Sequence, residues 1–212
     1  MTSILVAYGT KEGQTEKIAE YIETVLEERG HKATVLSVND FPAETAVTDF
    51  DAVFVGSSIH MGKHVKKVSR FVKENREAIE ARPNAFFQVS LSSAFPSEEN
   101  DAHVAEYIAE FVEETGWEPD RIGAFGGALR FSEYGFFTRM IMKRIARDTI
   151  GETDASQDHE YTDWDEVEAF AADVAAIVEM DGSAVSDEIA TGDEVAVGDV
   201  MTTGDETEET SA

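Results

Sequence analysis

The feature that most constrains the fold is an alternation of short apolar segments with longer amphipathic ones. The apolar segments are expected to be strands at residues 3–8, 33–38, 52–55, 85–91 and 122–125. Apolar residues at helical spacing follow at residues 14–29, 65–79, 104–112 and 167–178. Strands without a polar side are buried on both faces, and parallel strands need a crossover connection that is usually a helix. The sequence therefore predicts an α/β fold, a doubly wound five-stranded parallel sheet with helices on both faces.

Composition narrows the chemistry that such a fold can perform. The chain has 212 residues, of which 42% are hydrophobic, which suits one domain of ordinary size with a real core. It contains no cysteine. Disulfides, zinc–thiolate sites, cysteine-ligated iron–sulfur clusters and thiol nucleophiles are therefore excluded. Any redox chemistry has to be carried by a bound cofactor.

The net charge is strongly negative. The chain has 44 acidic and 17 basic residues, which gives −27 at pH 7. Such a surplus repels phosphates at long range, so we expect no nucleic-acid partner. It is also typical of a halophilic protein, because self-repulsion is screened to a Debye length of about 3 Å at 1 M salt.

The end of the sequence differs from the rest. Residues 181–212 contain ten acidic residues, no Lys or Arg and no aromatic residue. We therefore predict a domain at 1–180 and an acidic, disordered tail at 181–212. The sequence has no apolar run of the roughly 18 residues that cross a bilayer, and it does not begin like a signal peptide. These two observations predict a cytoplasmic protein.

About 35 residues separate the strand at 122–125 from the last helix, which predicts an insertion at about 127–160 with a helix at 134–147. Basic residues concentrate in one earlier segment, which we call the first basic island, and in this insertion, which we call the second basic island. The first island contains Lys63, Lys66, Lys67, Arg70, Lys73 and Arg76, and the second contains Arg130, Arg139, Lys143, Arg144 and Arg147. Two interpretations stay open: a landing surface for substrate propionates or lipid headgroups, or local pairing with neighbouring carboxylates.

The loop after the first strand has the composition of a phosphate cradle. It has the sequence Gly-Thr-Lys-Glu-Gly-Gln-Thr at 9–15 and leads directly into the first helix. Backbone N–H groups at a helix N-terminus favour an anion, and the Thr and Gln side chains can donate hydrogen bonds to phosphate oxygens. It is neither a Walker A loop nor a GxGxxG fingerprint. The alternative is an ordinary strand–helix turn with a Thr cap.

The loops after the other strands share these features. They lie at 56–63, 92–96 and 126–131, and they are rich in glycine and hydroxyl residues with a few bulky side chains. In a doubly wound sheet a ligand binds outside the carboxyl ends of the strands, where the strand order reverses. We expect these loops to form one site with the first loop.

Six short motifs resemble a known family. They are GTKEGQT at 9–15, GSSIHMG at 56–62, WEPDR at 117–121, GGALRF at 126–131, GETD at 151–154 and YTDW at 161–164. The first resembles the phosphate loop of the flavodoxin family. Together, in this order, they are similar to the flavodoxin-like menaquinone-dependent protoporphyrinogen IX dehydrogenases. The resemblance covers about residues 1–178 and implies a long-chain flavodoxin-like fold with a helical insertion.

The resemblance implies FMN as the cofactor. The residues that it implies for FMN binding are Thr10, Lys11, Glu12, Gly13, Gln14, Thr15, Ser57, Ser58, Ile59, His60, Met61, Gly62, Ser92, Ser93, Ala94, Phe95, Gly127, Ala128, Leu129, Arg130 and Phe131. The first six would hold the phosphate, and the others would flank the ribityl chain and the ring. Family members often have an aromatic residue where this chain has Met61 beside His60, which leaves Phe95 or Phe131 to stack on the flavin.

The resemblance also implies an activity, the dehydrogenation of a tetrapyrrole, protoporphyrinogen IX to protoporphyrin IX, in porphyrin biosynthesis. A quinone, menaquinone in this family, would take the electrons. The lipid interpretation of the second basic island adds peripheral membrane contact through the helix at 134–147. Three alternatives stay open: a flavodoxin-type electron carrier, an FMN-dependent quinone reductase with another substrate, and a flavin-free binding module. No residue stands out as a catalytic base. The five histidines lack metal-ligand spacing, so we predict no metal site.

Overall fold

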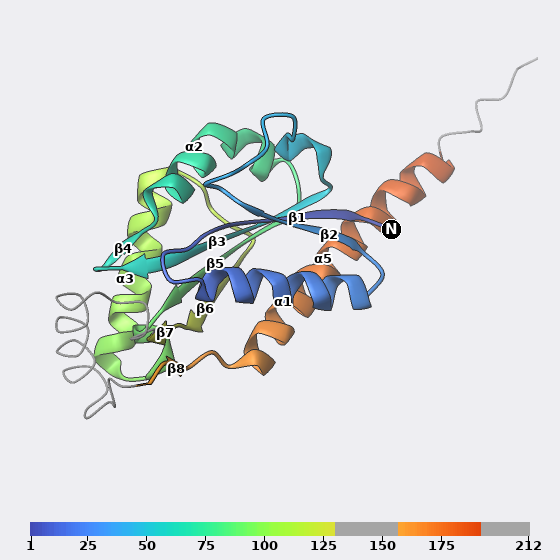
Figure 1. The fold of residues 1–212 in the computed structure, drawn as a ribbon. Helices are drawn as coiled ribbons and strands as arrows, with labels where there is room; N and C mark the ends of the chain where they lie inside the picture. The colour runs from blue at the N-terminus through green and yellow to red at the C-terminus, as the bar shows by residue number, and fades with distance from the viewer. Residues whose placement is uncertain (130–156, 192–212) are drawn as a thin grey trace, which may run out of the picture.

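The structure is a computed structural model and describes residues 1–129 and 157–191. Five parallel strands form its central sheet in the order β2-β1-β3-β5-β6 (Figure 1). They are β1 (Ser3–Gly9), β2 (Lys32–Ser37), β3 (Ala52–His60), β5 (Asn84–Ser90) and β6 (Arg121–Gly126). This sheet confirms the predicted doubly wound fold. The strand order reverses between β1 and β3, which makes their carboxyl ends the expected binding edge.

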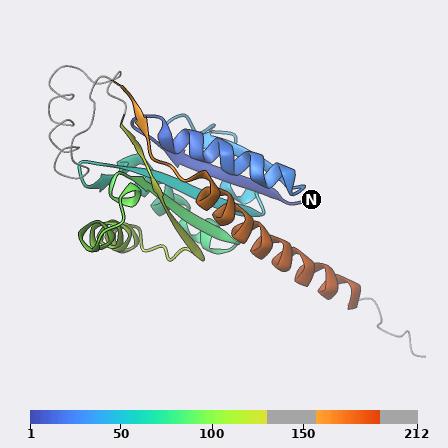
Figure 2. The ribbon, with the colours of Figure 1, turned by 90° about the horizontal axis from the view of Figure 1, so that it is seen from below.

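Helices cover both faces of the sheet. They are α1 (Gln14–Glu28), α2 (Lys66–Glu80), α3 (Glu98–Thr115) and α5 (Trp164–Thr191). Successive side chains of a strand point to opposite faces, so Ile4 and Val6 pack with α1 and α5, whereas Leu5 and Ala7 pack with α2 and α3. Figures 1 and 2 show these helices in two layers with the sheet between them.

Two helices are longer than their apolar patterns predict. Helix α3 begins at Glu98, well before the predicted start at residue 104, because Ser97 caps it by accepting a hydrogen bond from the backbone N–H of Asn100 (3.1 Å). Acidic residues in its first turn favour this start through the helix dipole. Helix α5 continues past residue 180 to Thr191, so the expectation that the disordered tail begins at 181 is wrong for 181–191. Residues 192–212 of the predicted tail lie outside the described residues.

The segment at 56–63 is not the loop that the sequence predicted. Strand β3 continues through His60, turns at Met61 and Gly62, and pairs with the short antiparallel strand β4 (Lys63–His64). Both turn residues have positive φ, 51° and 73°, as a two-residue hairpin turn requires. The polar residues Ser57 and Ser58 stay in the ladder beside β5 because strand pairing uses backbone groups.

The predicted insertion is flanked by a second, two-stranded sheet. Strand β7 (Ala128–Leu129) pairs antiparallel with β8 (His159–Glu160). The two ends of the intervening segment therefore lie side by side. The helix predicted at 134–147 and the GETD motif lie outside the described residues, as do Arg130 and Phe131. Within the described residues, no helix is long and apolar enough to span a membrane.

A buried polar anchor joins β5 to the start of β6. The Trp117 side chain is fully buried, and its indole Nε1–H donates to Asn84 Oδ1 (3.0 Å). Asn84 Nδ2 donates to the backbone oxygen of Arg82 (2.9 Å), and the backbone N–H of Asn84 donates to Asp120 Oδ2 (2.9 Å). The WEPDR motif thus has a structural role, because it fixes the register at which the last strand enters the sheet.

The first prediction concerns this anchor. Asn84→Ala leaves the buried indole N–H of Trp117 without an acceptor, so we expect the free energy of unfolding to fall by about 2–3 kcal/mol. Chemical denaturation measures this loss. The control Asn39→Ala changes a residue on the surface and should stay within about 0.5 kcal/mol of the parent. Equal stability of the two variants would contradict the anchor.

Candidate functional site

A cavity of about 560 Å³ lies at the carboxyl ends of β1, β3 and β5, at the point where strand order reverses. Its walls come from the loop after β1, the end of β3 and its turn, the segment after β5, the first half of α3, and the residues that follow β6. The lining residues are Thr10, Lys11, Glu12, Gln14, Thr15, Ser58, Ile59, His60, Met61, Gly62, Val89, Ser90, Leu91, Ser92, Ser97, Glu99, Asn100, His103, Tyr107, Gly127 and Ala128.

The loop after β1 is folded tightly around its second glycine. Gly13 has φ 82° and occupies the N-cap position of α1, and its N–H donates to Thr10 Oγ1 (2.9 Å). A positive φ is readily adopted only by glycine, so this residue sets the angle at which the helix starts. The N-terminus of α1 therefore lies at the cavity, where its dipole favours an anion.

Three buried polar atoms around the cavity have no hydrogen-bond partner within the described part of the chain. They are Gln14 Oε1, Thr15 Oγ1 and Ser58 Oγ. Thr15 is fully buried, and an unsatisfied buried hydroxyl costs about 1–3 kcal/mol. Together with a helix N-terminus, these atoms fit a ligand that carries a phosphate and further polar groups.

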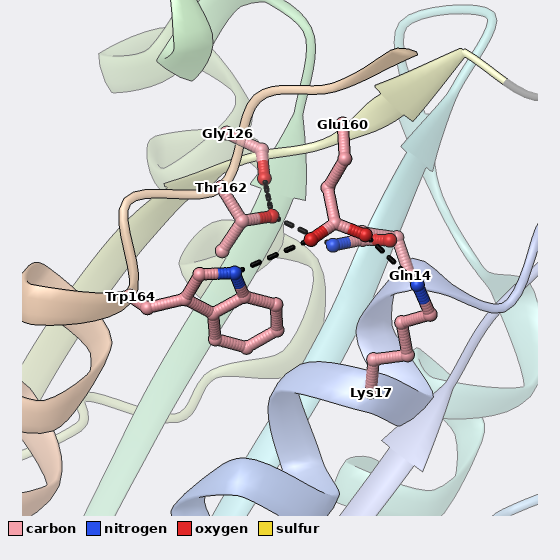
Figure 3. A network of polar contacts seen from close by, with 6 residues as sticks. All are labelled: Gln14, Lys17, Gly126, Glu160, Thr162 and Trp164. Carbon is pink, nitrogen blue, oxygen red and sulfur yellow. Dashed lines mark hydrogen bonds and ion pairs between the residues drawn. The ribbon is translucent and has the colours of Figure 1, made fainter. Parts of the chain in front are cut away.

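The phosphate loop is tied to a segment almost 150 residues further along the chain (Figure 3). Gln14 Nε2 donates to Thr162 Oγ1 (2.7 Å), and that hydroxyl donates to the backbone oxygen of Gly126 (2.7 Å). A side chain at Gly126 would collide with the backbone oxygen of Tyr161, since a Cβ there would lie 2.3 Å from it. The GGALRF and YTDW motifs therefore meet at a close backbone approach beside the site.

Glu160 forms the second half of this network. Its carboxylate accepts hydrogen bonds from Lys17 Nζ (2.8 Å) and from Trp164 Nε1 (3.2 Å). Partial burial would raise the pKa of Glu160, but the hydrogen bond and charge of Lys17 outweigh it, so the pKa is lowered. Glu160 thus stays ionised and links α1 to the start of α5.

His64 of β4 packs between the sheet and α3. It contacts the rings of Phe86 and Phe111, with centroids 5.5 and 4.8 Å away, and its Nε2 lies 3.1 Å from the backbone oxygen of Tyr107. Burial lowers the pKa of His64 to about 4. At neutral pH it is therefore uncharged, and Nε2–H is the donor to that oxygen.

The wall from α3 was missed by the sequence analysis. Four side chains of this helix line the cavity, namely Glu99, Asn100, His103 and Tyr107. Asn100 Nδ2 also donates to the backbone oxygen of Phe95 (2.7 Å), which holds the segment after β5 in place. The rings of His103 and Tyr107 lie nearly parallel, with centroids 6.3 Å apart. The Ser97 capping signal could have revealed the early start of the helix and hence this wall.

The predicted binding residues fall into three groups. Those that line the cavity are Thr10, Lys11, Glu12, Gln14, Thr15, Ser58, Ile59, His60, Met61, Gly62, Ser92, Gly127 and Ala128. Those that lie outside its lining are Gly13, Ser57, Ser93, Ala94, Phe95 and Leu129. Arg130 and Phe131 lie outside the described residues.

The second group has local reasons to turn away from the cavity. Ser57 is buried, and its Oγ accepts from the backbone N–H of Val65 (3.1 Å). The Phe95 ring makes an edge-to-face contact with Tyr161 (4.8 Å between centroids), and its stacking on the flavin stays a prediction. Leu129 is fully buried. Within the described ranges, no three metal-ligating side chains cluster.

Fold and site together define a class of protein, a doubly wound α/β protein with a phosphate loop at its strand-order switch point. Residues 5–156 match the Flavodoxin domain family, here its Flavodoxin_5 branch. The chain is 33% identical over 175 residues to protoporphyrinogen IX dehydrogenase [quinone] of Escherichia coli K12, which covers 82% of this chain and 96% of that protein. The Leishmania major protein of the same name is also 33% identical, over 82% of this chain and 74% of that one.

Among solved structures, the chain is similar to oxidised flavodoxin 2 from Bacillus cereus. The identity is 18%, the TM-score is 0.48, and the match covers 82% of this chain and 98% of that one. The family match spans well over half of the chain, so the chain belongs to the Flavodoxin domain family. Its cofactor is accordingly FMN, and the buried Thr15 hydroxyl at the start of α1, which has no partner within the described residues, fits that cofactor's phosphate as a hydrogen-bond donor.

The second prediction uses the titration of His64. The pKa of His64 is about 4 in the folded chain and 6.5 in its ordinary state, so the unfolded chain binds more protons between these pH values. His64 therefore lowers stability as the pH falls from 6.5 to 4. His64→Gln keeps a donor for the Tyr107 oxygen but cannot titrate. We expect the free energy of unfolding of the variant to fall less over this interval than that of the parent. The difference between them should reach up to about 3 kcal/mol. Denaturant unfolding between pH 7 and pH 4 measures the difference, and parallel pH curves would contradict it.

Proposed function

We propose that this chain is an FMN-dependent oxidoreductase that oxidises protoporphyrinogen IX to protoporphyrin IX with a quinone as the electron acceptor. Its relatives of that printed name match it over most of its length. The observation that carries the proposal is the cavity at the switch point, which is lined by unpartnered buried polar atoms and remains large enough for a flat cofactor.

Different residues around the cavity would bind different parts of the cofactor. The hydroxyl of Thr15 and the backbone N–H groups that begin α1 would bind the phosphate, and Ser58 would reach the ribityl chain. The hairpin turn at Met61–Gly62 and the adjacent ring of Tyr107 from α3 would together form one wall beside the flat ring. FMN, when bound, supplies hydride acceptance and onward electron transfer, so the chain itself needs no catalytic nucleophile.

Two side chains that line the cavity, His60 and Glu12, lie close to each other. His60 Nδ1 lies 3.8 Å from Glu12 Oε1, which connects the end of β3 with the phosphate loop. This contact brings together two of the segments that line the cavity. We assign neither His60 nor Glu12 the role of a catalytic base.

The proposal has three finer parts. The quinone would be menaquinone, and the chain would meet the cytoplasmic face of the membrane peripherally, through the segment at 134–147, because a quinone with an isoprenoid tail stays in the bilayer. The working environment would be high in salt, which the net charge of −27 supports. With 44 acidic and 17 basic residues, the solvent-facing surface would consist largely of carboxylates.

The third prediction tests the activity directly. We expect FMN-loaded protein in molar salt, mixed anaerobically with protoporphyrinogen IX and a menaquinone analogue, to form protoporphyrin IX, measured by its fluorescence. Formation should require both FMN and the quinone. A protein that exchanges electrons with the quinone but forms no porphyrin would be an electron carrier or a quinone reductase with another substrate. The same protein without FMN is the control.

The fourth prediction tests the phosphate site. Thr15→Val removes a hydroxyl that has no partner within residues 1–129 and 157–191, so we expect the dissociation constant for FMN to rise at least about tenfold. The stability of the FMN-free protein should stay the same or increase. The control Thr24→Val, on the exposed face of α1, should leave FMN affinity unchanged. Fluorescence titration of FMN measures both, and equal affinities would remove Thr15 from the site.

A further inference from the structure

A second cavity, of about 600 Å³, lies on the other side of the β3–β4 hairpin, between α2 and α3. Its basic lining residues are Lys63, Lys66, Arg70 and Lys73, all from the first basic island. Its acidic lining residues are Glu74, Glu110 and Glu114. The lining thus carries an excess of positive charge on a chain whose net charge is −27.

The four cations are not equivalent. Lys73 Nζ pairs with Glu114 (3.0 Å), whose carboxylate also accepts a hydrogen bond from Ser69 (3.2 Å). Within the described residues, Lys63, Lys66 and Arg70 have no ion pair within 4.0 Å. These three side chains are exposed, and we call them the basic triad. The interpretation that the island pairs locally therefore holds for Lys73 and for Arg76, which pairs with Glu80 (4.0 Å), but not for the triad.

The start of α2 adds to the positive potential. Within the described part of the chain no side chain caps this helix, so the positive end of its dipole lies uncapped on the side where Lys66 begins the helix. Cations are disfavoured at a helix N-terminus unless an anion joins them. The triad is thus arranged to receive an external anion.

The hairpin places this charge next to the flavin cavity. His60 and Gly62 line the first cavity, and Lys63 lines the second. His60 and Lys63 are directly paired across the hairpin, so their Cα atoms are about 5 Å apart. A molecule as broad as a tetrapyrrole, lying against the first cavity, extends across this turn.

We propose that the basic triad binds the propionate carboxylates of a tetrapyrrole whose ring lies at the flavin cavity. This inference rests on the proposed function and adds the part of the chain that recognises the acidic side chains of the substrate. A lipid headgroup is the less suitable anion. Of the exposed large apolar side chains in the described residues, only Met61 lies beside the triad, whereas a membrane surface is bound through several apolar side chains as well as cations.

The fifth prediction compares two porphyrins on FMN-loaded protein, at the lowest salt concentration at which FMN stays bound. Protoporphyrin IX has two carboxylates, and its dimethyl ester has none. We expect the triple variant Lys63→Gln, Lys66→Gln, Arg70→Gln to bind the diacid about tenfold more weakly and the ester as tightly as the parent does, since exposed ion pairs contribute modestly and additively. Porphyrin fluorescence gives both dissociation constants without turnover.

The matched control is Arg29→Gln, Lys32→Gln, Lys67→Gln, which removes the same charge from residues that line neither cavity. Its affinity for the diacid should stay within about twofold of the parent. Equal loss in both variants would overturn the proposal, as would equal loss of diacid and ester. If the triad variant loses only its binding to phosphatidylglycerol vesicles, the cations serve a lipid surface and the proposal is wrong. If the parent binds neither porphyrin, the proposed function itself fails.

Discussion

The arrangement of the site depends on the hydroxyl of Thr162, which joins three segments that are distant in sequence. It accepts from Gln14 at the start of α1 and donates to the backbone oxygen of Gly126 at the end of β6. The chain that returns from the segment after β7 is thereby fixed against the phosphate loop. Glu160 repeats this connection with Lys17 a few residues earlier. A hydrogen-bonded network of this kind holds its members in one geometry because every partly buried polar atom in it would otherwise lose its partner.

The Thr162 network also explains why two unsatisfied polar atoms lie close to it. Gln14 uses its amide nitrogen in the network, but its Oε1 has no partner in the part of the chain that the structure describes, and neither has Thr15 Oγ1 in the next residue. The network therefore fixes the backbone of the loop without consuming the groups that face the cavity. A rigid loop whose Thr15 hydroxyl is unpartnered within the described residues can bind a phosphate without the cost of ordering the loop first. This separation of structural and binding contacts is the physical basis of the FMN site.

The sequence predicted the parts of the fold that depend on apolar burial. All five parallel strands and the helices α1 and α2 follow continuous or periodic apolar residues, which have few other stable arrangements. It failed where polar residues continue a regular element. The end of β3 was missed because Ser57 and Ser58 pair through their backbone, and the start of α3 was missed because its first turn is acidic. Both errors fall at the site, and together they concealed the hairpin and the α3 wall. The packing of Phe95 against Tyr161 joins residues far apart in the chain, which no local pattern reveals.

The fold shows that the net charge describes the average surface and not the local charge around the triad. A value of −27 describes the average surface and argues against anionic ligands only at long range, where contributions add up. Within a few ångströms the nearest charges dominate, and Lys63, Lys66 and Arg70 are neighbours on one face of a hairpin and helix. In molar salt the long-range repulsion from the acidic surface is screened almost completely, whereas a direct contact between a carboxylate and a cation loses less. High salt would therefore improve the access of an anionic substrate to such a cluster. An acidic surface and a carboxylate-binding site are compatible in the same protein for this reason.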